Sequence, residues 1–161
     1  MIRVSKMADY GVVAISYMAR DPKLHYSAAQ VSRNTGVPLP SASKVLKLLA
    51  KANILYSRRG ATGGYRLSKD PHHISVADLV IAIDGPIAIT DCLEQTSGNT
   101  CSLEEICFVR KPWQKVSKAI QVALEEVTLA DIAGSYPKST TTKETVGGSP
   151  EVFAHLRNLN N

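Results

Sequence analysis

The chain has 161 residues, a formal net charge of +5, and 44% hydrophobic residues, enough for one compact domain with an appendage. It contains no apolar run long enough to span a bilayer, and its first residues lack the apolar region of a signal peptide. We therefore expect a cytoplasmic protein without a membrane partner. Residues 1–70 carry twelve Lys and Arg against three Asp, a net charge of +9, whereas residues 71–161 carry −4. A basic half of this kind is typical of a module that binds a polyanion.

The first predicted helix covers residues 6–20. Ser5 can cap its start and Pro22 ends it. Its apolar side chains follow the helical period, which predicts a buried face made of Met7, Tyr10, Val13 or Ala14, Tyr17 and Met18.

Two short helices joined by a tight turn are predicted next. Ser27 and Gln30 form a capping box that opens a helix ending near Asn34, and Gly36 follows it. The next helix covers residues 41–53. Its predicted buried stripe is Ala42, Val45, Leu46, Leu49 and Ala52, and a basic stripe on another face consists of Lys44, Lys47 and Lys51. Two helices in this arrangement indicate a helix-turn-helix.

A glycine-rich hairpin follows at once. Residues 54–58 have the composition of a strand, residues 59–64 that of a turn, and residues 65–67 pair back. The hairpin carries Arg58, Arg59 and Arg66. Any single basic residue here could be an ordinary solvated side chain. The basic stripe, the hairpin and the net charge together favour a winged helix-turn-helix that binds DNA, covering residues 1–70.

Residues 71–91 are predicted to connect this module to a cysteine segment, through a helix from Ser75 to Asp84. The segment, residues 92–107, holds all three cysteines of the chain, Cys92, Cys101 and Cys107. Their spacing lacks the Cys-x2-Cys pair of a zinc finger. Thiolates suit zinc or iron–sulfur clusters, and an odd number of cysteines argues against a disulfide framework.

A long helix is predicted over residues 104–127, because Ser102 and Glu105 form a capping box, and Cys107 would lie in its first turns. Apolar side chains alternate along it by four and three, at Val109, Trp113, Val116, Ile120, Ala123 and Val127. In a monomer this stripe would pack on the protein's own core, but the spacing favours pairing of two helices and a homodimer. Thr128 and Asp131 cap a short last helix, so residues 104–133 form the dimerisation region. Residues 134–161 read as a flexible tail.

The predicted fold is therefore mainly α-helical with a small β-hairpin: a winged helix-turn-helix plus a long C-terminal dimerisation helix. In this order the elements resemble the iron–sulfur-sensing transcription regulators of the IscR, NsrR and RirA kind. The resemblance covers residues 1 to about 133 and is most specific in residues 4–10, 58–66 and 74–78 and in the three cysteines. Residues 84–92 and 127–133 look most like the subgroup that regulates the SUF cluster-assembly operon.

The resemblance implies that Cys92, Cys101 and Cys107 bind an iron–sulfur cluster, [2Fe–2S] or [4Fe–4S], whose occupancy changes affinity for an operator. It also implies base contacts from Ser41, Ser43 and Lys44 and a minor-groove contact from Arg59, while Lys47 and Lys51 suit phosphates.

Two departures concern the cluster ligands. The first cysteine gap is x8 where x5 is common, and Arg110 stands where some members have a histidine ligand. Asp9 of the partner subunit matches a carboxylate ligand of some relatives, and Glu104 and Glu105 are rival candidates for the fourth ligand. Asp9 reads equally well as an ordinary polar residue of a first helical turn.

Three hypotheses remain open. The first is a dimeric regulator, by resemblance a repressor, that senses iron–sulfur status and controls SUF genes. The second keeps DNA binding but replaces the cluster with a regulatory disulfide. The third is a cluster or metal carrier whose basic face docks an acidic protein. An enzyme with a small-molecule substrate is not expected, since the sequence shows no catalytic triad, phosphate-cradling loop or convincing carboxylate pair.

Overall fold

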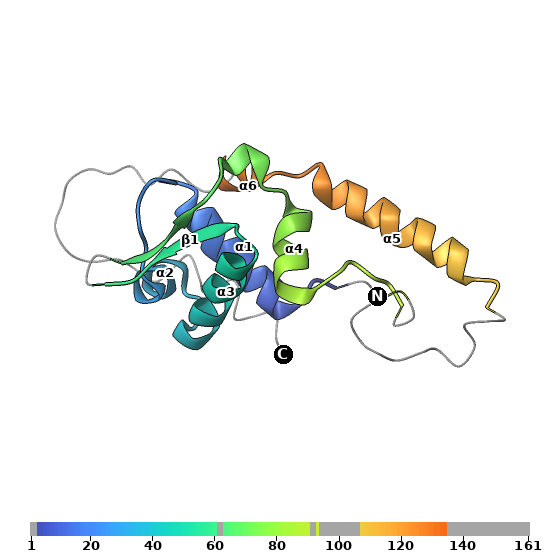
Figure 1. The fold of residues 1–161 in the computed structure, drawn as a ribbon, viewed down its shortest axis with the longest axis horizontal. Coiled ribbons are helices and arrows are strands. Elements are labelled where there is room, and N and C mark those ends of the chain that lie inside the picture. The colour runs from blue at the N-terminus through green and yellow to red at the C-terminus, as the bar shows by residue number, and fades with distance from the viewer. Residues whose placement is uncertain (1–2, 61–62, 91–92, 94–106, 135–161) are drawn as a thin grey trace.

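The computed structural model describes residues 3–60, 63–90, 93 and 107–134 (Figure 1). The elements are α1 (Lys6–Met18), α2 (Ala28–Thr35), α3 (Leu39–Lys51), β1 (Leu55–Arg58), β2 (Gly64–Leu67), the 3-10 turn η1 (Pro71–His73), α4 (Val76–Asp84), α5 (Arg110–Glu125) and α6 (Leu129–Gly134). The predicted fold class is confirmed: the chain is mainly helical with a two-stranded antiparallel hairpin. The predicted tail and most of the cysteine segment lie outside the described residues.

Helix α1 begins as predicted and ends two residues early. The Ser5 hydroxyl accepts a hydrogen bond from the Ala8 N–H at 3.0 Å and donates one to the Asp84 carboxylate at 2.6 Å, which ties the start of α1 to the end of α4. The predicted apolar face packs against the core: Ala14 and Met18 are fully buried, and Met7, Tyr10 and Tyr17 are partly buried. Ile15, which is also fully buried, is missing from the predicted face.

The helix-turn-helix consists of α2 and α3. The capping box at α2 is present, with the Gln30 N–H 3.2 Å from the Ser27 hydroxyl and the Ser27 N–H 2.8 Å from the Gln30 side-chain oxygen. Helix α3 begins at Leu39, two residues before the predicted start, because proline is well tolerated in a first helical turn. Of its predicted buried stripe only Ala52 is wrong, since it caps the helix and is exposed.

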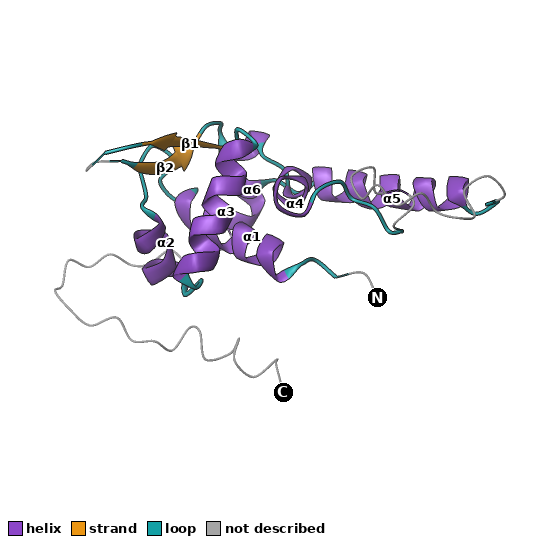
Figure 2. Cartoon of the chain, turned by 60° about the horizontal axis from the view of Figure 1, so that its bottom comes forward, coloured by secondary structure: helices purple, strands orange, loops and turns teal. Residues whose placement is uncertain are grey.

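The hairpin is joined to the body of the protein by a third extended segment. Leu55 pairs with Leu67 at the base, and Arg58 pairs with Gly64 near the tip. Tyr26, between α1 and α2, forms an antiparallel bridge with Tyr65 through two backbone hydrogen bonds of 2.8 and 2.9 Å. The bridge fixes the hairpin beside the helix-turn-helix (Figure 2).

One hydrophobic core runs from α1 to α6. It contains side chains of α1, α2, α3, the hairpin and α4, and also Leu129 of α6, which is fully buried. The chain before α6 returns to the start of α4, where Ser75 and Thr128 form an antiparallel bridge. The Leu129 N–H donates to the Ile74 carbonyl at 2.8 Å. The residues that follow the long helix are therefore part of the core that holds the helix-turn-helix.

Helix α5 projects from this body (Figures 1 and 2). Ser117 is its one buried residue, and the Ser117 hydroxyl accepts a hydrogen bond from the Ile89 N–H at 3.3 Å. The helix begins at Arg110, so Cys107 precedes it by three residues and the prediction of Cys107 in its first turns is wrong. Among the described residues, no helix has the length and apolar character needed to cross a membrane.

Candidate nucleic-acid interface and cysteine segment

The solvent face of α3 carries the predicted basic stripe. Lys44, Lys47 and Lys51 are all exposed, while the opposite face of the helix is buried in the core. Within the described part of the chain none of the three lysines pairs with a carboxylate. Ser41 and Ser43 are half-buried in the first turns of the helix. This face thus presents uncompensated positive charge beside short polar side chains, a combination suited to a nucleic-acid backbone and base edges.

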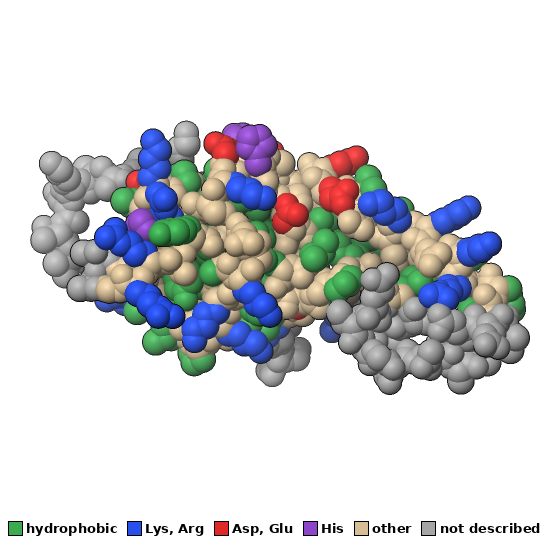
Figure 3. All heavy atoms as spheres, viewed as in Figure 1, with side chains coloured by type: hydrophobic (Ala, Val, Ile, Leu, Met, Phe, Trp, Pro, Cys, Tyr) green, Lys and Arg blue, Asp and Glu red, His purple; other side chains and the backbone are tan. Residues whose placement is uncertain are grey.

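The hairpin adds further cations to the same region. Arg58, Arg59 and Arg66 are exposed, and Arg59 lies in the turn after β1. The Arg66 guanidinium lies over the ring of Tyr56, its partner across the strands, at 5.3 Å from the ring centroid. Figure 3 shows Lys and Arg side chains gathered over α3 and the hairpin and again along α5, with Asp and Glu side chains lying between these two regions. The basic side chains of α3 and the hairpin therefore form one positively charged region of the surface.

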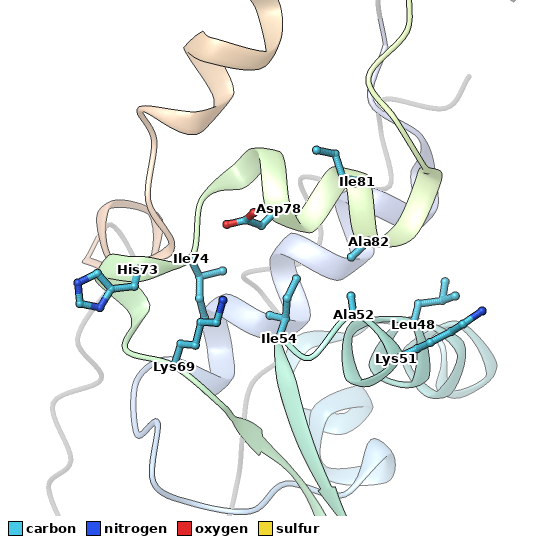
Figure 4. Close-up of a pocket in the computed structure, with 10 residues that line it drawn as sticks. All are labelled: Leu48, Lys51, Ala52, Ile54, Lys69, His73, Ile74, Asp78, Ile81 and Ala82. Carbon is cyan, nitrogen blue, oxygen red and sulfur yellow. The ribbon is translucent and has the colours of Figure 1, made fainter. Parts of the chain in front are cut away.

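A hollow of about 450 Å³ lies where the end of α3 meets β1, η1 and α4 (Figure 4). Its apolar lining includes Leu48, Ile54 and Ile81. The charged side chains of Lys69 and Asp78 also line it, but Asp78 is engaged in the capping box of α4, where its carboxylate accepts the Ser75 N–H at 2.9 Å. The hollow therefore lies next to the C-terminal end of α3 and adjoins its exposed surface.

Of the three predicted cluster ligands, only Cys107 falls within the described residues, and Cys92 and Cys101 lie outside them. Cys107 is half-buried and makes no disulfide. The described residues bring together no group of three or more His, Cys, Asp and Glu side chains that could hold a metal. The donor set of three thiols in one connecting segment, with a half-buried free thiol at its end, fits an iron–sulfur cluster by its chemistry.

Asp9, the candidate fourth ligand, and Arg110, which stands where some relatives have a histidine ligand, lie on different helices. Asp9 is exposed in the first turn of α1, so its carboxylate is accessible to a second copy of the chain. Arg110 is the first residue of α5, and its side-chain Nε is buried. Glu104 and Glu105 lie outside the described residues. The ligand role of Asp9 stays a prediction.

The predicted dimerisation stripe lies along one side of α5. Trp113, Val116 and Val127 are 40%, 41% and 40% exposed, and Val109 is 38% exposed. Ile120 is half-buried and Ala123 is exposed. The single chain therefore leaves much of this apolar surface in water, which is unfavourable for a stripe of large side chains.

Two features of the basic surface are missing from the predicted site. Leu39 is 47% exposed at the first turn of α3, and the pair of prolines around it was the available signal. Tyr56 is 51% exposed on β1, and His25 lies edge-on to it with ring centroids 6.5 Å apart. No local sequence pattern predicts the contact between His25 and Tyr56, because it joins a loop to a strand that is distant in the sequence.

The fold, the β1–β2 hairpin as the wing, and the basic face of α3 together define a winged helix-turn-helix DNA-binding protein. Comparison with known families gives a match over residues 4–135 to the Rrf2 family, described as "Iron-dependent Transcriptional regulator". The chain belongs to the Rrf2 family of transcriptional regulators.

Individual relatives agree with this assignment. An Rrf2-like helix-turn-helix transcriptional regulator of Rhodobacter capsulatus is 30% identical over 136 residues, covering 80% of this chain and 91% of the relative. The transcriptional repressor NsrR of Streptomyces coelicolor is 26% identical over 136 residues, covering 83% and 90%. The solved structure of T. potens IscR is 26% identical with a TM-score of 0.60, covering 91% of this chain and 94% of that one. The protein is thus a DNA-binding transcriptional regulator and not an enzyme.

Proposed function

We propose that the protein is a homodimeric repressor whose affinity for DNA depends on an iron–sulfur cluster held by Cys92, Cys101 and Cys107, with Asp9 of the partner subunit as the candidate fourth ligand. The observation that carries the proposal is the confinement of all three cysteines to the segment between α4 and α5 of an Rrf2 chain. The family description as iron-dependent and the relationship to the repressor NsrR support it. A basic DNA-binding face supports a regulator rather than a carrier.

DNA recognition is proposed to use α3 and the wing in different ways. Ser41, Ser43 and Lys44 lie in the first half of α3, the part of a recognition helix that reaches base edges in the major groove. Lys47 and Lys51, further along, suit phosphate contacts. The arginines of the hairpin, Arg58, Arg59 and Arg66, suit the backbone and the minor groove, into which Arg59 at the turn is proposed to insert.

Dimerisation is proposed to occur through Val109, Trp113, Val116, Ile120, Ala123 and Val127 of the segment around α5. The support is the exposure of large apolar side chains along one side of a projecting helix. A second copy of the same stripe would remove them from water. Two copies would also present two α3 helices, which matches paired half-sites in DNA.

The cysteine segment is well placed to influence the spacing of two α3 helices. It begins just after α4, whose end is tied to α1 through Ser5 and Asp84, and it ends at α5. The thiolates would coordinate the cluster iron, and binding would favour one setting of α4 relative to α5. A ligand that binds two settings with different affinity shifts the population between them. Two α3 helices whose separation no longer matches the one-turn spacing of the DNA half-sites then bind DNA less well.

The decisive experiment is the visible spectrum, with iron and acid-labile sulfide content, of protein purified without oxygen. We expect a brown protein, and we expect Cys→Ala at each of the three positions to remove the chromophore. Ser97→Ala, a change of similar size within the same segment, is the control and should retain it. Full cluster absorbance in all three single cysteine variants would show that the ligand assignment is wrong.

A thiol switch on the same DNA-binding dimer is the second candidate. The half-buried free thiol of Cys107 favours it, because such a thiol can pair with another cysteine of the segment upon oxidation. In that case the anaerobic protein is colourless, cannot be reconstituted with iron and sulfide, and has three titratable thiols. Loss of one pair of thiols on oxidation, together with a change in DNA affinity, would establish this function in place of the cluster.

Control of SUF cluster-assembly genes is proposed as the biological output. The support is the likeness of residues 84–92 and 127–133 to that subgroup of regulators. Genome-wide mapping of the DNA bound by the protein tests it. A binding site upstream of cluster-assembly genes is expected, and bound sites that exclude those genes would contradict it.

A further inference from the structure

The tip of α3 has an unusual chemistry for a helix that faces DNA. Pro38, Leu39 and Pro40 are consecutive and all three are exposed. Pro38 occupies the N-cap position without a side-chain hydrogen bond, and Pro40 lies in the first turn. Leu39 is 47% exposed between them. The part of α3 that would enter a groove first therefore presents an aliphatic side chain rather than a polar one.

This tip has almost no capacity to form hydrogen bonds with base edges. Proline has no backbone N–H, and none of the three side chains carries a polar atom. Helix starts usually carry Ser, Thr, Asp or Asn at the cap, and the first hydroxyl available here is that of Ser41. The prolines also restrict the backbone on both sides of Leu39, which limits the directions in which its side chain can point.

The major groove offers one apolar feature to such a side chain. Each base pair presents donors and acceptors there, and the C5-methyl group of thymine is the apolar exception. From the position of Leu39 at the tip of α3, ahead of the exposed Lys44 and Lys47, we infer that Leu39 contacts a thymine methyl group in each half-site and thereby selects T at that position. This inference rests on the proposed use of α3 as the recognition helix.

An exposed leucine alone would carry no such meaning, since many surface leucines serve no contact. Leu24 provides the comparison within this chain. It is 52% exposed, but it lies in the connection between α1 and α2 and has no proline beside it. Leu24→Ala is therefore a matched control for Leu39→Ala: the same side chain is truncated at similar exposure, away from α3.

The test begins with duplexes selected by the full-length protein from a randomised DNA library. Each thymine of the selected duplex is then replaced in turn by uracil, which removes only the methyl group, and the dissociation constant is measured by fluorescence anisotropy at fixed salt. We expect one thymine per half-site at which uracil weakens binding about fourfold, the effect of losing one buried methyl group. Replacement in both half-sites should weaken binding about 15-fold, if the two contacts are independent.

The protein variants assign this sensitivity to a side chain. Leu39→Ala should bind the thymine duplex more weakly and should no longer distinguish thymine from uracil at that position. Leu24→Ala should retain the full difference. Specific binding with no methyl-sensitive thymine, or unchanged sensitivity in Leu39→Ala, would overturn the role of Leu39 while leaving DNA recognition by α3 intact. Failure to enrich any duplex would overturn the proposed function as well, so the two failures can be told apart.

Discussion

The attachment of the wing depends on Gly64, and replacing it by alanine tests this attachment directly. Gly64 has φ = +148°, a conformation that side chains rarely adopt. A Cβ atom there would lie 2.8 Å from the carbonyl oxygen of Tyr26 and 2.9 Å from its carbonyl carbon. Both neighbours are backbone atoms of the segment that pairs with Tyr65, so neither can rotate away as a side chain could.

The expected loss has two parts. Holding alanine at this φ costs roughly 1–3 kcal/mol. Relieving the overlap requires the Tyr26–Tyr65 bridge to open, which removes two backbone hydrogen bonds worth about 1 kcal/mol each. Gly60→Ala separates the two parts, because Gly60 also has positive φ, +112°, but a Cβ atom there meets nothing within 4 Å. We expect Gly64→Ala to lower the free energy of unfolding by about 2 kcal/mol more than Gly60→Ala does.

Urea unfolding followed by circular dichroism, at one protein concentration for all variants, measures this difference. A 2 kcal/mol difference should also separate the melting temperatures by about 4–8 °C in a protein of this size. Equal destabilisation by the two substitutions would refute the steric part of the reasoning, and greater destabilisation by Gly60→Ala would refute the attachment of the wing through Tyr26.

Four further outcomes are expected. Arg59→Ala should weaken binding to a selected operator by about 1–3 kcal/mol in a titration, and unchanged affinity would remove Arg59 from the interface. Lys47→Ala should reduce the slope of log K against log salt by about 1 with little change in sequence preference; an altered preference would instead indicate a base contact. Trp113→Glu should give a monomer in light scattering after gel filtration, while the exposed Lys118→Glu should leave a dimer, and a dimeric Trp113→Glu variant would contradict pairing through α5. Burial raises the pKa of the Tyr26 hydroxyl above 10.0. The contribution of the neutral hydroxyl to folding stability is therefore fully present below about pH 10 and is lost as the pH rises through the folded-state pKa. Tyr26→Phe should lose less stability than the unchanged protein in alkaline unfolding, and an identical pH profile for the two would contradict this role of Tyr26.

Local signals in the sequence predicted the starts of α1, α2, α4 and α6, but not those of α3 and α5. The pairs Ser27–Gln30, Ser75–Asp78 and Thr128–Asp131 all form reciprocal capping hydrogen bonds, because each depends only on residues three apart. Errors arose where packing decides. In α1 the deeply buried side follows from close contact with α4, where Gly11 leaves room for Ile83, and the period of α1 alone does not contain that information.

The candidate site divides in a similar way. Exposure of the three α3 lysines and of the wing arginines follows from patterns within short segments and was predictable. The sequence pattern does not predict the exposed tip around Leu39, because it places Pro38 and Pro40 before the helix, whereas Pro38 is the N-cap of α3 and Pro40 lies in its first turn. The cluster ligands and the dimer seam depend on contacts between distant segments or between two copies, and both stay predictions.

The burial of Leu129 has a consequence for how the protein is made. Synthesis proceeds from the N-terminus, so the complete helix-turn-helix leaves the ribosome well before α5 and α6 exist. Its core nevertheless lacks a fully buried leucine, and the start of α4 lacks its bridge to Thr128, until those last residues have emerged. A nascent chain that ends after α4 should therefore be only loosely folded and a poor DNA binder. Firm binding is expected only from chains that already carry the helix proposed for pairing.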